Sequence, residues 1–361
     1  MKCCGKIASV MLALALCLML PGLSTAATLE ERVFALEEKA GGLGDWLGKI
    51  KLSGLIEVEA NYLNFDPDEG SSEDESDLTL ATVELGIDVD FIKHVSGHVL
   101  LLWEEDDTEP LDVDEAFIRL DGEDVVPLYL QAGKMYVPFG NFDSFFISDP
   151  LTLELGETRE SAALAGYAND MFDLSFGVFN GDIDEKGDDD HIDSFVASAI
   201  YTMPENAVEG LELTSGVAWI SNIADSDVLS DEIAVDAISD KVGGISAFVT
   251  ATLNERWTLV AEYVGALDEF KAGELAFDDG KALEPKTWNF ELGCAVTDAL
   301  EVALRYEGGD DLGDLLPDSQ YGIVASYGLF EYTTLALEYL HGEFENDDEQ
   351  DVVTAQLAFE F

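Results

Sequence analysis

The end of the chain carries apolar side chains with a period of two. Over 351–361 every second residue is apolar, in the set Val353, Ala355, Leu357, Phe359 and Phe361. A period of two is the pattern of a β-strand whose two faces meet different surroundings. No chain follows to cover the apolar face, so that face needs an apolar solvent, which lipid around a β-barrel provides. The sequence therefore predicts a transmembrane strand here, and with it an export signal, an even number of strands and long loops on one side.

The beginning of the chain has the layout of a secretory signal peptide. Lys2 and Lys6 precede an apolar run over 7–20, and small residues follow at 24–26. The run is shorter than the ~20 residues that a membrane-spanning helix needs. A positive start, a short apolar run and a small-residue cleavage site together define a signal peptide. We therefore expect residues 1–26 to be removed on export.

A second amphipathic unit follows at 28–50. Apolar residues recur from Leu29 to Ile50 at alternating spacings of four and three, with charged residues between them. This heptad spacing is typical of a coiled coil, although the glycines at 41, 42 and 44 weaken its second half. The pattern leaves two structures open. One is a short periplasmic coiled coil that makes the protein a homotrimer through 29–50, and the other is a single helix against the mouth of the barrel.

From Lys51 onward the period of the apolar residues changes to two, which indicates β-strands. The predicted strands number sixteen and lie at 52–62, 78–91, 95–104, 113–120, 126–136, 161–169, 171–179, 193–201, 210–221, 242–253, 256–266, 286–297, 299–307, 318–328, 331–341 and 351–361. The predicted fold is all-β: residues 51–361 form a transmembrane antiparallel β-barrel of about 16 strands. The strand at 351–361 should pair with 52–62 and close the barrel.

The connections between these strands alternate in length. Long ones such as 63–77 and 267–285 alternate with tight ones such as 92–94. Outer-membrane barrels have long loops outside and short turns inside. We therefore expect a protein of the bacterial outer membrane with both ends of the barrel on the periplasmic side. Sixteen strands use nearly all of 51–361 and leave no room for a plug, so passage should be passive.

Charge and cysteine content exclude several classes of function. The chain carries 17 lysines and arginines against 76 acidic residues, a net charge of −59. Nucleic acid is a polyanion that this chain would repel, so it is not an expected partner. Cys294 is the only cysteine beyond the signal segment, and no Cys/His cluster suggests a metal site. The four histidines form no Ser-His-Asp arrangement, so we expect neither catalysis nor a cofactor.

Three stretches of the chain resemble a known family. They are 78–86, 102–115, and 133–142 with the following 148–161. Together with the predicted strands and the terminal Phe361, they make the chain similar to the LbtU-type siderophore porins, from the N-terminal helix through most of the barrel. The resemblance implies an outer-membrane porin for iron uptake, through which iron–siderophore complexes pass. The strand pattern by itself supports only the barrel and the pore.

The connection 137–160 is the predicted constriction of the pore. A barrel of about 16 strands is wide enough to hold an aqueous channel. In trimeric porins the third external loop folds inward, and 137–160 resembles that loop in position; a cap over the outer mouth is the alternative. The candidate constriction and solute-binding residues are acids of the loop and nearby cations, namely Arg119, Lys134, Asp143, Asp149, Glu154, Glu157, Arg159 and Arg305.

Two functions remain open for this pore. The four candidate cations suit an anionic iron chelate, but each has the alternative role of pairing with carboxylates of the barrel wall. The net charge of −59 opposes that substrate, because an acidic channel repels polycarboxylates and attracts cations. A general, carbohydrate-selective or cation-selective porin is therefore the alternative to a siderophore porin. Acidic outer loops such as 63–77 also predict contact with lipopolysaccharide through bridging divalent cations.

Overall fold

The structure is a computed structural model that describes residues 48–68, 70–105, 111–122, 124–187, 191–205 and 207–361. The chain divides into two units, 1–49 and 50–361. The predicted signal peptide at 1–26 lies outside the described residues. So does the predicted helix or coiled coil at 28–50, except at its end, where Ile50 belongs to the first strand. The homotrimer expected through 29–50 stays a prediction.

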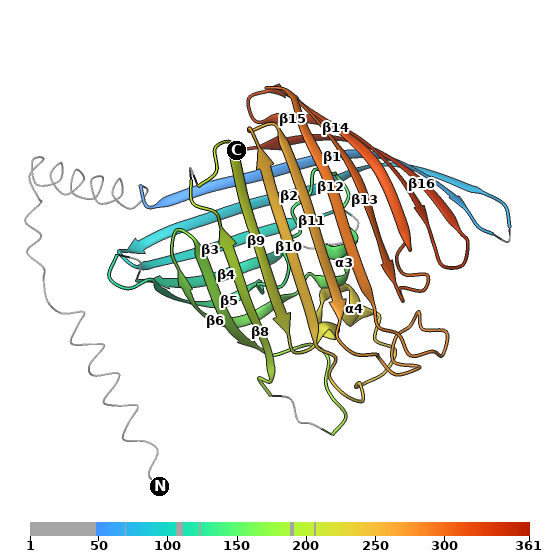
Figure 1. Cartoon of the computed structure of the whole chain (residues 1–361), viewed down its shortest axis with the longest axis horizontal. Coiled ribbons are helices and arrows are strands. Elements are labelled where there is room, and N and C mark those ends of the chain that lie inside the picture. Colours follow the sequence, from blue (N-terminus) through green and yellow to red (C-terminus); the bar gives the residue numbers. More distant parts are fainter. Residues whose placement is uncertain (1–47, 69, 106–110, 123, 188–190, 206) are drawn as a thin grey trace, which may run out of the picture. The chain divides into compact units, whose positions relative to one another are not determined.

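Sixteen antiparallel strands in the unit 50–361 form one closed barrel, in which the last strand pairs with the first (Figure 1). The strands are β1 (Ile50–Asp66), β2 (Glu73–Ile92), β3 (Val95–Trp103), β4 (Asp112–Asp121), β5 (Leu128–Tyr136), β6 (Arg159–Ala168), β7 (Phe172–Phe179), β8 (Ser194–Thr202), β9 (Leu211–Ile220), β10 (Gly244–Leu253), β11 (Trp257–Ala266), β12 (Lys286–Thr297), β13 (Leu300–Asp310), β14 (Ser319–Phe330), β15 (Thr333–Glu343) and β16 (Glu349–Glu360). The described connections hold the short helices α3 (Leu151–Gly156), η1 (Ile223–Asp225) and α4 (Asp227–Asp231). Within this part of the chain, no helix has the length and apolar character needed to cross a membrane.

Each predicted strand is present, so the predicted fold class is confirmed. The largest difference in strand ends is at β2, which is predicted to begin at Leu78 and begins at Glu73. The acidic side chains of 73–77 indicate a loop, but their backbone continues the ladder with β1, where Phe65 pairs with Glu73. Ladder hydrogen bonds join backbone groups. They therefore continue where the side chains are no longer apolar.

The final strand closes the barrel as predicted. β16 pairs with β1 from Leu55↔Glu360 to Asp66↔Glu349, and its other edge pairs with β15. An unpaired strand edge would leave backbone N–H and C=O groups without partners in lipid, at a cost of several kcal/mol for each group. Closure removes both edges at once, which is why a strand at the far end of the sequence lies beside the first.

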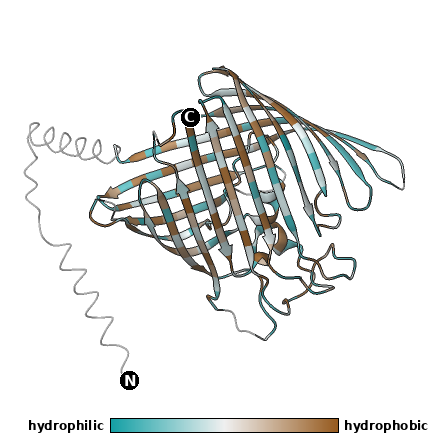
Figure 2. Ribbon diagram, viewed as in Figure 1, coloured by the Kyte–Doolittle hydropathy of each residue, from teal (hydrophilic) through white to brown (hydrophobic). Residues whose placement is uncertain are grey.

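The barrel exposes apolar side chains on its outside and buries polar side chains inside. On β12, Phe290 is 50% exposed while its neighbour Glu291 is 1% exposed. Figure 2 shows the same alternation of hydrophobic and hydrophilic residues along the strands. A soluble protein has the reverse arrangement. Lipid around the outer face makes exposed leucine and phenylalanine favourable, and the polar face turns to the lumen.

Several of the long connections pack into a shared hydrophobic core. The β9–β10 connection contributes Ile223 and Leu229, and the β11–β12 connection contributes Leu275, all of them almost fully buried. An isolated β-bridge joins Ile233 to Leu275. The same core includes residues of the β5–β6 connection. The outer loops therefore pack against that connection as well as against each other.

Candidate solute passage through the barrel

The β5–β6 connection, residues 137–158, lies against the inward faces of several strands, and we call it the inner loop. Its helix α3 contacts β11, β12 and β13 (Figure 1). Phe139 near its beginning and Leu155 near its end are almost fully buried. Gly140 has a φ of 96° and Phe142 a φ of 55°. These positive values turn the backbone sharply where the loop leaves the strand.

Four inward-facing glutamates, one each on β11, β12, β13 and β15, hold the inner loop by its backbone. Each accepts a hydrogen bond from a loop N–H group. The N···O pairs are Asn141 to Glu262 at 2.7 Å, Phe145 to Glu291 at 2.8 Å, Leu151 to Glu307 at 2.8 Å and Ile147 to Glu338 at 2.6 Å. These charge-assisted bonds compensate the carboxylates for their removal from water. Because they reach backbone groups, they fix the path of the loop rather than the positions of single side chains.

Arg305 on β13 joins two of these glutamates to the loop. It lies opposite Glu291 of β12, and it shares a strand face with Glu307 because side chains alternate along a strand. Its Nε donates to Glu291 at 2.9 Å and its Nη1 to Glu307 at 3.2 Å. The guanidinium also donates to the carbonyl oxygens of Ser148 at 2.9 Å and Asp149 at 3.3 Å. Arg305 thus pairs with carboxylates of the barrel wall, and its side chain is 0% exposed.

The inner loop covers one part of the barrel wall and leaves another part open. Inward-facing Glu262, Asn289 and Glu307 of β11–β13 are buried beneath it. On β1 the inward-facing Glu57 and Glu59 keep part of their surface exposed. The inner loop therefore leaves the wall at β1 partly open, and we call the space beside β1 the open part of the lumen.

Carboxylates of the inner loop and of β1 act on one another. Burial raises the pKa of Asp149 on the inner loop, Arg305 lowers it, and the negative charge of Glu59 on β1 raises it again. Glu57 and Glu59 lie two residues apart on β1 and so share its inward face. A narrow space between like charges concentrates cations and repels anions.

Two further carboxylates of the inner loop titrate near neutral pH. Burial raises the pKa of Glu154 to about 7, and the charges of Asp149 and Glu307 add to the effect. Burial raises the pKa of Glu157 to about 8, and Asp227 in α4 adds to it. A carboxyl group in an acidic, partly dry environment keeps its proton to higher pH. The negative charge of the inner loop therefore depends on pH in this range.

We expect the cation preference of the channel to increase between about pH 6 and pH 9. At the lower pH Glu154 and Glu157 are largely protonated and neutral, and at the higher pH each carries a negative charge. The measurement is the reversal potential of the protein in a planar bilayer under a KCl gradient at several pH values. In the double variant Glu154→Gln, Glu157→Gln the profile should be flatter. A wild-type preference that falls as pH rises would contradict the assignment.

The structure does not bring the four candidate cations together. Lys134 and Arg159 pair with Asp112 and Asp114 of β4. On β5 and β6 they alternate with buried residues, Met135 and Glu160, and so belong to the opposite strand face. Neither is in contact with Arg305, whose partners are on β12, β13 and the inner loop.

Arg119 and Asp143 are apart from each other and from the other candidate residues. Arg119 Nε donates to Asp121 at 3.2 Å, and its guanidinium carbon lies 4.0 Å from the centre of the Tyr129 ring. Asp143 on the inner loop accepts a hydrogen bond of 3.4 Å from the Thr250 hydroxyl. Of the candidate residues, Asp149, Glu154 and Glu157 of the inner loop are the ones whose charges act on one another.

Glu262, Glu307 and Glu338 were not among the candidate site residues. The sequence shows each of them only as an acidic residue on the polar face of a predicted strand. Many other acids of this chain have the same position, including Glu57 and Glu59. Alternation assigns the strand face, but it does not tell a glutamate that meets water from one that receives the backbone of a loop.

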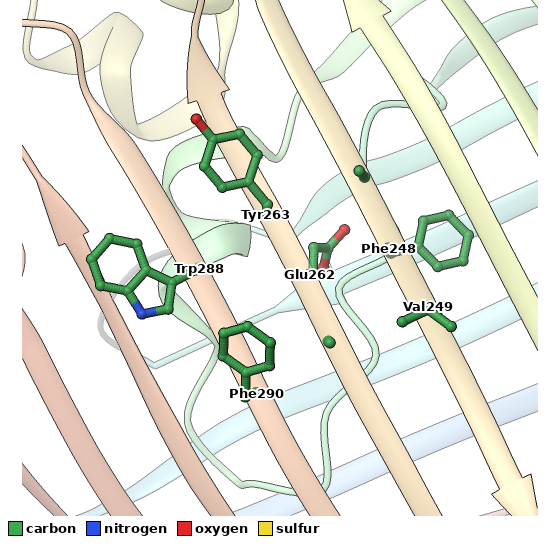
Figure 3. Close-up of a pocket in the computed structure, with 8 residues that line it drawn as sticks. Phe248, Val249, Glu262, Tyr263, Trp288 and Phe290 are labelled. Atoms are coloured by element: carbon green, nitrogen blue, oxygen red, sulfur yellow. The ribbon is translucent and has the colours of Figure 1, made fainter.

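The outer face of β10–β12 has a groove of about 550 Å³ that is separate from the lumen. Most of its lining comes from outward-facing residues, including Ala247, Ala261 and Trp288. Figure 3 shows Trp288 and Phe290 at this groove, with Glu262 on the same stretch of wall. Glu262 bonds to the inner loop on the other side of the sheet. The groove is thus part of the lipid-facing surface.

Comparison with known proteins finds relatives at about a quarter sequence identity. No family model matches the chain. It is 24% identical over 320 residues to the UPF0422 protein lpg2959 of Legionella pneumophila, covering 81% of this chain and 58% of that protein. It is 24% identical over 324 residues to a UPF0422 protein of Coxiella burnetii, covering 85% of this chain and 67% of that protein. The chain therefore spans less than two thirds of the Legionella relative.

Solved structures with a similar fold are outer-membrane channels. The channel DcaP of Acinetobacter baumannii has a TM-score of 0.60 at 15% identity, covering 86% of this chain and 97% of that one. An anion-selective porin from Comamonas acidovorans has a TM-score of 0.58 at 15% identity, covering 86% and 99%. These likenesses establish the porin fold. The closed barrel and its apolar outer face place the protein in the bacterial outer membrane.

Proposed function

We propose that this protein is a porin, a plug-free channel through which small hydrophilic solutes diffuse across the outer membrane, with a preference for cations. The observation that carries the proposal is that the inner loop is bound to the wall at β11, β12, β13 and β15, while the inward-facing Glu57 and Glu59 of β1 stay partly exposed. Solutes would pass between these glutamates and the inner loop, which carries Asp149. A ring of one charge sign at the narrowest part of a pore selects ions of the opposite sign.

Two of the candidate cations already have acidic partners. Arg305 is buried between Glu291 and Glu307, and it also lowers the pKa of Asp149. Arg119 is paired with Asp121. The positive charges of these two residues are thus shared with carboxylates, which favours a net acidic passage.

Conductance in planar bilayers tests the proposal. The full mature chain should be refolded into detergent and added to a bilayer under a KCl gradient. We expect stable channels, and the sign of the reversal potential should show that potassium permeates more easily than chloride. Glucose in the bath should not block them. Absence of any channel, or a preference for chloride, would overturn the proposed function.

The resemblance of 133–142 and 148–161 to LbtU-type siderophore porins supports a second candidate function, the passage of iron–siderophore complexes. The acidic passage favours chelates that carry amines or are neutral over polycarboxylate chelates. Concentration-dependent block of the potassium current by a ferric chelate, with no block by the iron-free chelator, would support this function. If none of the ferric chelates tested changed the potassium current, this second function would be excluded.

Two partners remain proposals. The heptads of 29–50 would join three copies of the chain, and crosslinking of the full-length protein in detergent, compared with a chain lacking 28–49, would reveal this. The acidic outer ends of β1 and β2 would contact lipopolysaccharide through divalent cations. Retention of lipopolysaccharide by the purified barrel should then fall when EDTA is added.

A further inference from the structure

We propose that Arg305 is a positioning residue that sets the aperture of the channel by holding residues 144–149 of the inner loop against the barrel wall. The inference rests on the proposed porin function and goes beyond it, because it assigns the size of the passage to one buried side chain. Arg305 would not contact the solute. It would determine how much of the lumen the inner loop leaves open.

The first support is that all the hydrogen-bonding capacity of Arg305 is used within this contact. A guanidinium has five N–H donors. Those of Arg305 reach the carboxylates of Glu291 and Glu307 on the wall and, on the loop, the Ser144 hydroxyl and the carbonyl oxygens of Ser148 and Asp149. The side chain thus bridges wall and loop with no donor left for a solute.

The second support is the packing of the same side chain on the loop. The guanidinium carbon of Arg305 lies 4.2 Å from the centre of the Phe146 ring. Phe146 in turn packs with Leu340 and Val324 of the barrel wall in a small hydrophobic cluster. Such a cation–π contact is stronger where water is excluded. The flat guanidinium therefore fixes the loop by stacking as well as by hydrogen bonds.

The third support is charge balance. Glu291 and Glu307 are both buried and both accept hydrogen bonds from the inner loop. In the described part of the chain, Arg305 is the cation that forms ion pairs with them. Without it, two buried carboxylates would lose their counter-charge, and an uncompensated buried charge is strongly destabilising. Protonation or entry of water would relieve that strain, and both would weaken the hold on the loop backbone.

The geometry also explains why the contact is placed at this part of the loop. Residues 144–149 are the segment that approaches the wall of β12, β13 and β15, with Glu338 receiving the N–H groups of Ile147 and Ser148. Asp149, which faces the acidic wall of β1, is held by its carbonyl oxygen to Arg305. Loss of Arg305 would therefore release the backbone of Asp149 from the wall.

The test compares Arg305→Gln with Arg256→Gln in the full mature chain. Arg256 lies in the tight turn between β10 and β11, outside this contact. Single-channel conductance in KCl should be about twofold higher for Arg305→Gln, and polyethylene glycols of larger size should enter its pore, because conductance follows the open cross-section. Arg256→Gln should match the wild type. Arg305→Lys keeps the charge with three donors instead of five and should fall between the two.

A second variant keeps the test decisive if Arg305→Gln fails to fold. The triple variant Arg305→Gln, Glu291→Gln, Glu307→Gln removes the buried charges together and so avoids an uncompensated carboxylate. It should migrate as a folded, heat-modifiable barrel and show the same wider pore. Folded variants with the conductance and polymer cut-off of the wild type would overturn the role of Arg305. If the wild type forms no channel at all, the proposed porin function fails first, which is a distinguishable result.

Discussion

Replacement of Glu57, Glu59 and Asp149 by lysine should turn a cation-preferring channel into an anion-preferring one. Glu57 and Glu59 are on the inward face of β1, and Asp149 is on the inner loop, where the charge of Glu59 raises its pKa. Each substitution replaces a negative charge by a positive one where the space between loop and wall is limited, so the local potential changes sign. The reversal potential under a KCl gradient should therefore change sign. The barrel itself should stay folded, because Glu57 and Glu59 keep polar side chains on the inward face of β1 and Asp149 lies outside the strands.

The control changes the same number of charges at the tips of the outer hairpins. Asp68, Glu73 and Asp347 are exposed residues at or beyond the ends of β1, β2 and β15. Glu73 is paired with Phe65, six residues along β1 from Glu59, or roughly 20 Å at the rise of a strand. This is about twice the Debye length at 0.1 M salt. Lysine at these three tips should leave the sign of the reversal potential unchanged. If the sign changed in this variant too, selectivity would depend on the net charge of the protein and not on the residues of the lumen.

Arginine in place of Leu337 should destabilise the barrel strongly. Leu337 is on β15, 56% exposed, in the middle of the ladder with β14 and β16. An arginine facing lipid near the bilayer midplane costs about 2–4 kcal/mol. The free energy of unfolding, measured by urea titration of the protein in lipid vesicles with tryptophan fluorescence as the readout, should fall by about that amount.

Leu111 provides the matched control, since it is 58% exposed but lies in the β3–β4 connection. Leu111→Arg makes the same chemical change at nearly the same exposure, in water instead of lipid. Its free energy of unfolding should stay within about 0.5 kcal/mol of the wild type. Equal effects at the two positions would mean that the outer face of β15 is not in contact with lipid.

The strands were predictable because their defining property is local. Val353, Leu357 and Phe359 alternate with polar residues, and each such segment shows its period of two without reference to the rest of the chain. The number of strands then required a closing pair, which the ladder between β1 and β16 confirms. The start of β2 was wrong by five residues, 78 against 73, because side-chain polarity does not report where backbone pairing ends.

The candidate site was predictable only in part. The acids Asp149, Glu154 and Glu157 were identified by their place in the connection after β5, and their role in the passage stays a prediction. The cations were grouped by sequence position alone. Lys134 and Arg159 lie on the strand face opposite to the buried Met135 and Glu160. Both are near strand ends, where alternation in the sequence is a weak guide to the strand face.

The sequence by itself determined the barrel: strand number, the lipid-facing and lumen-facing sides, and closure of the last strand on the first, since these follow from a two-residue period and from the need to pair every strand edge in lipid. Only the tertiary structure decided which polar residues face a solute and which hold the inner loop. Ile147 bonds to Glu338, 191 residues away, and Ser144 to Glu291, 147 residues away. Such contacts exist only once the barrel has closed around the loop, so no local pattern distinguishes Glu291 and Arg305 from the acids and bases that meet water.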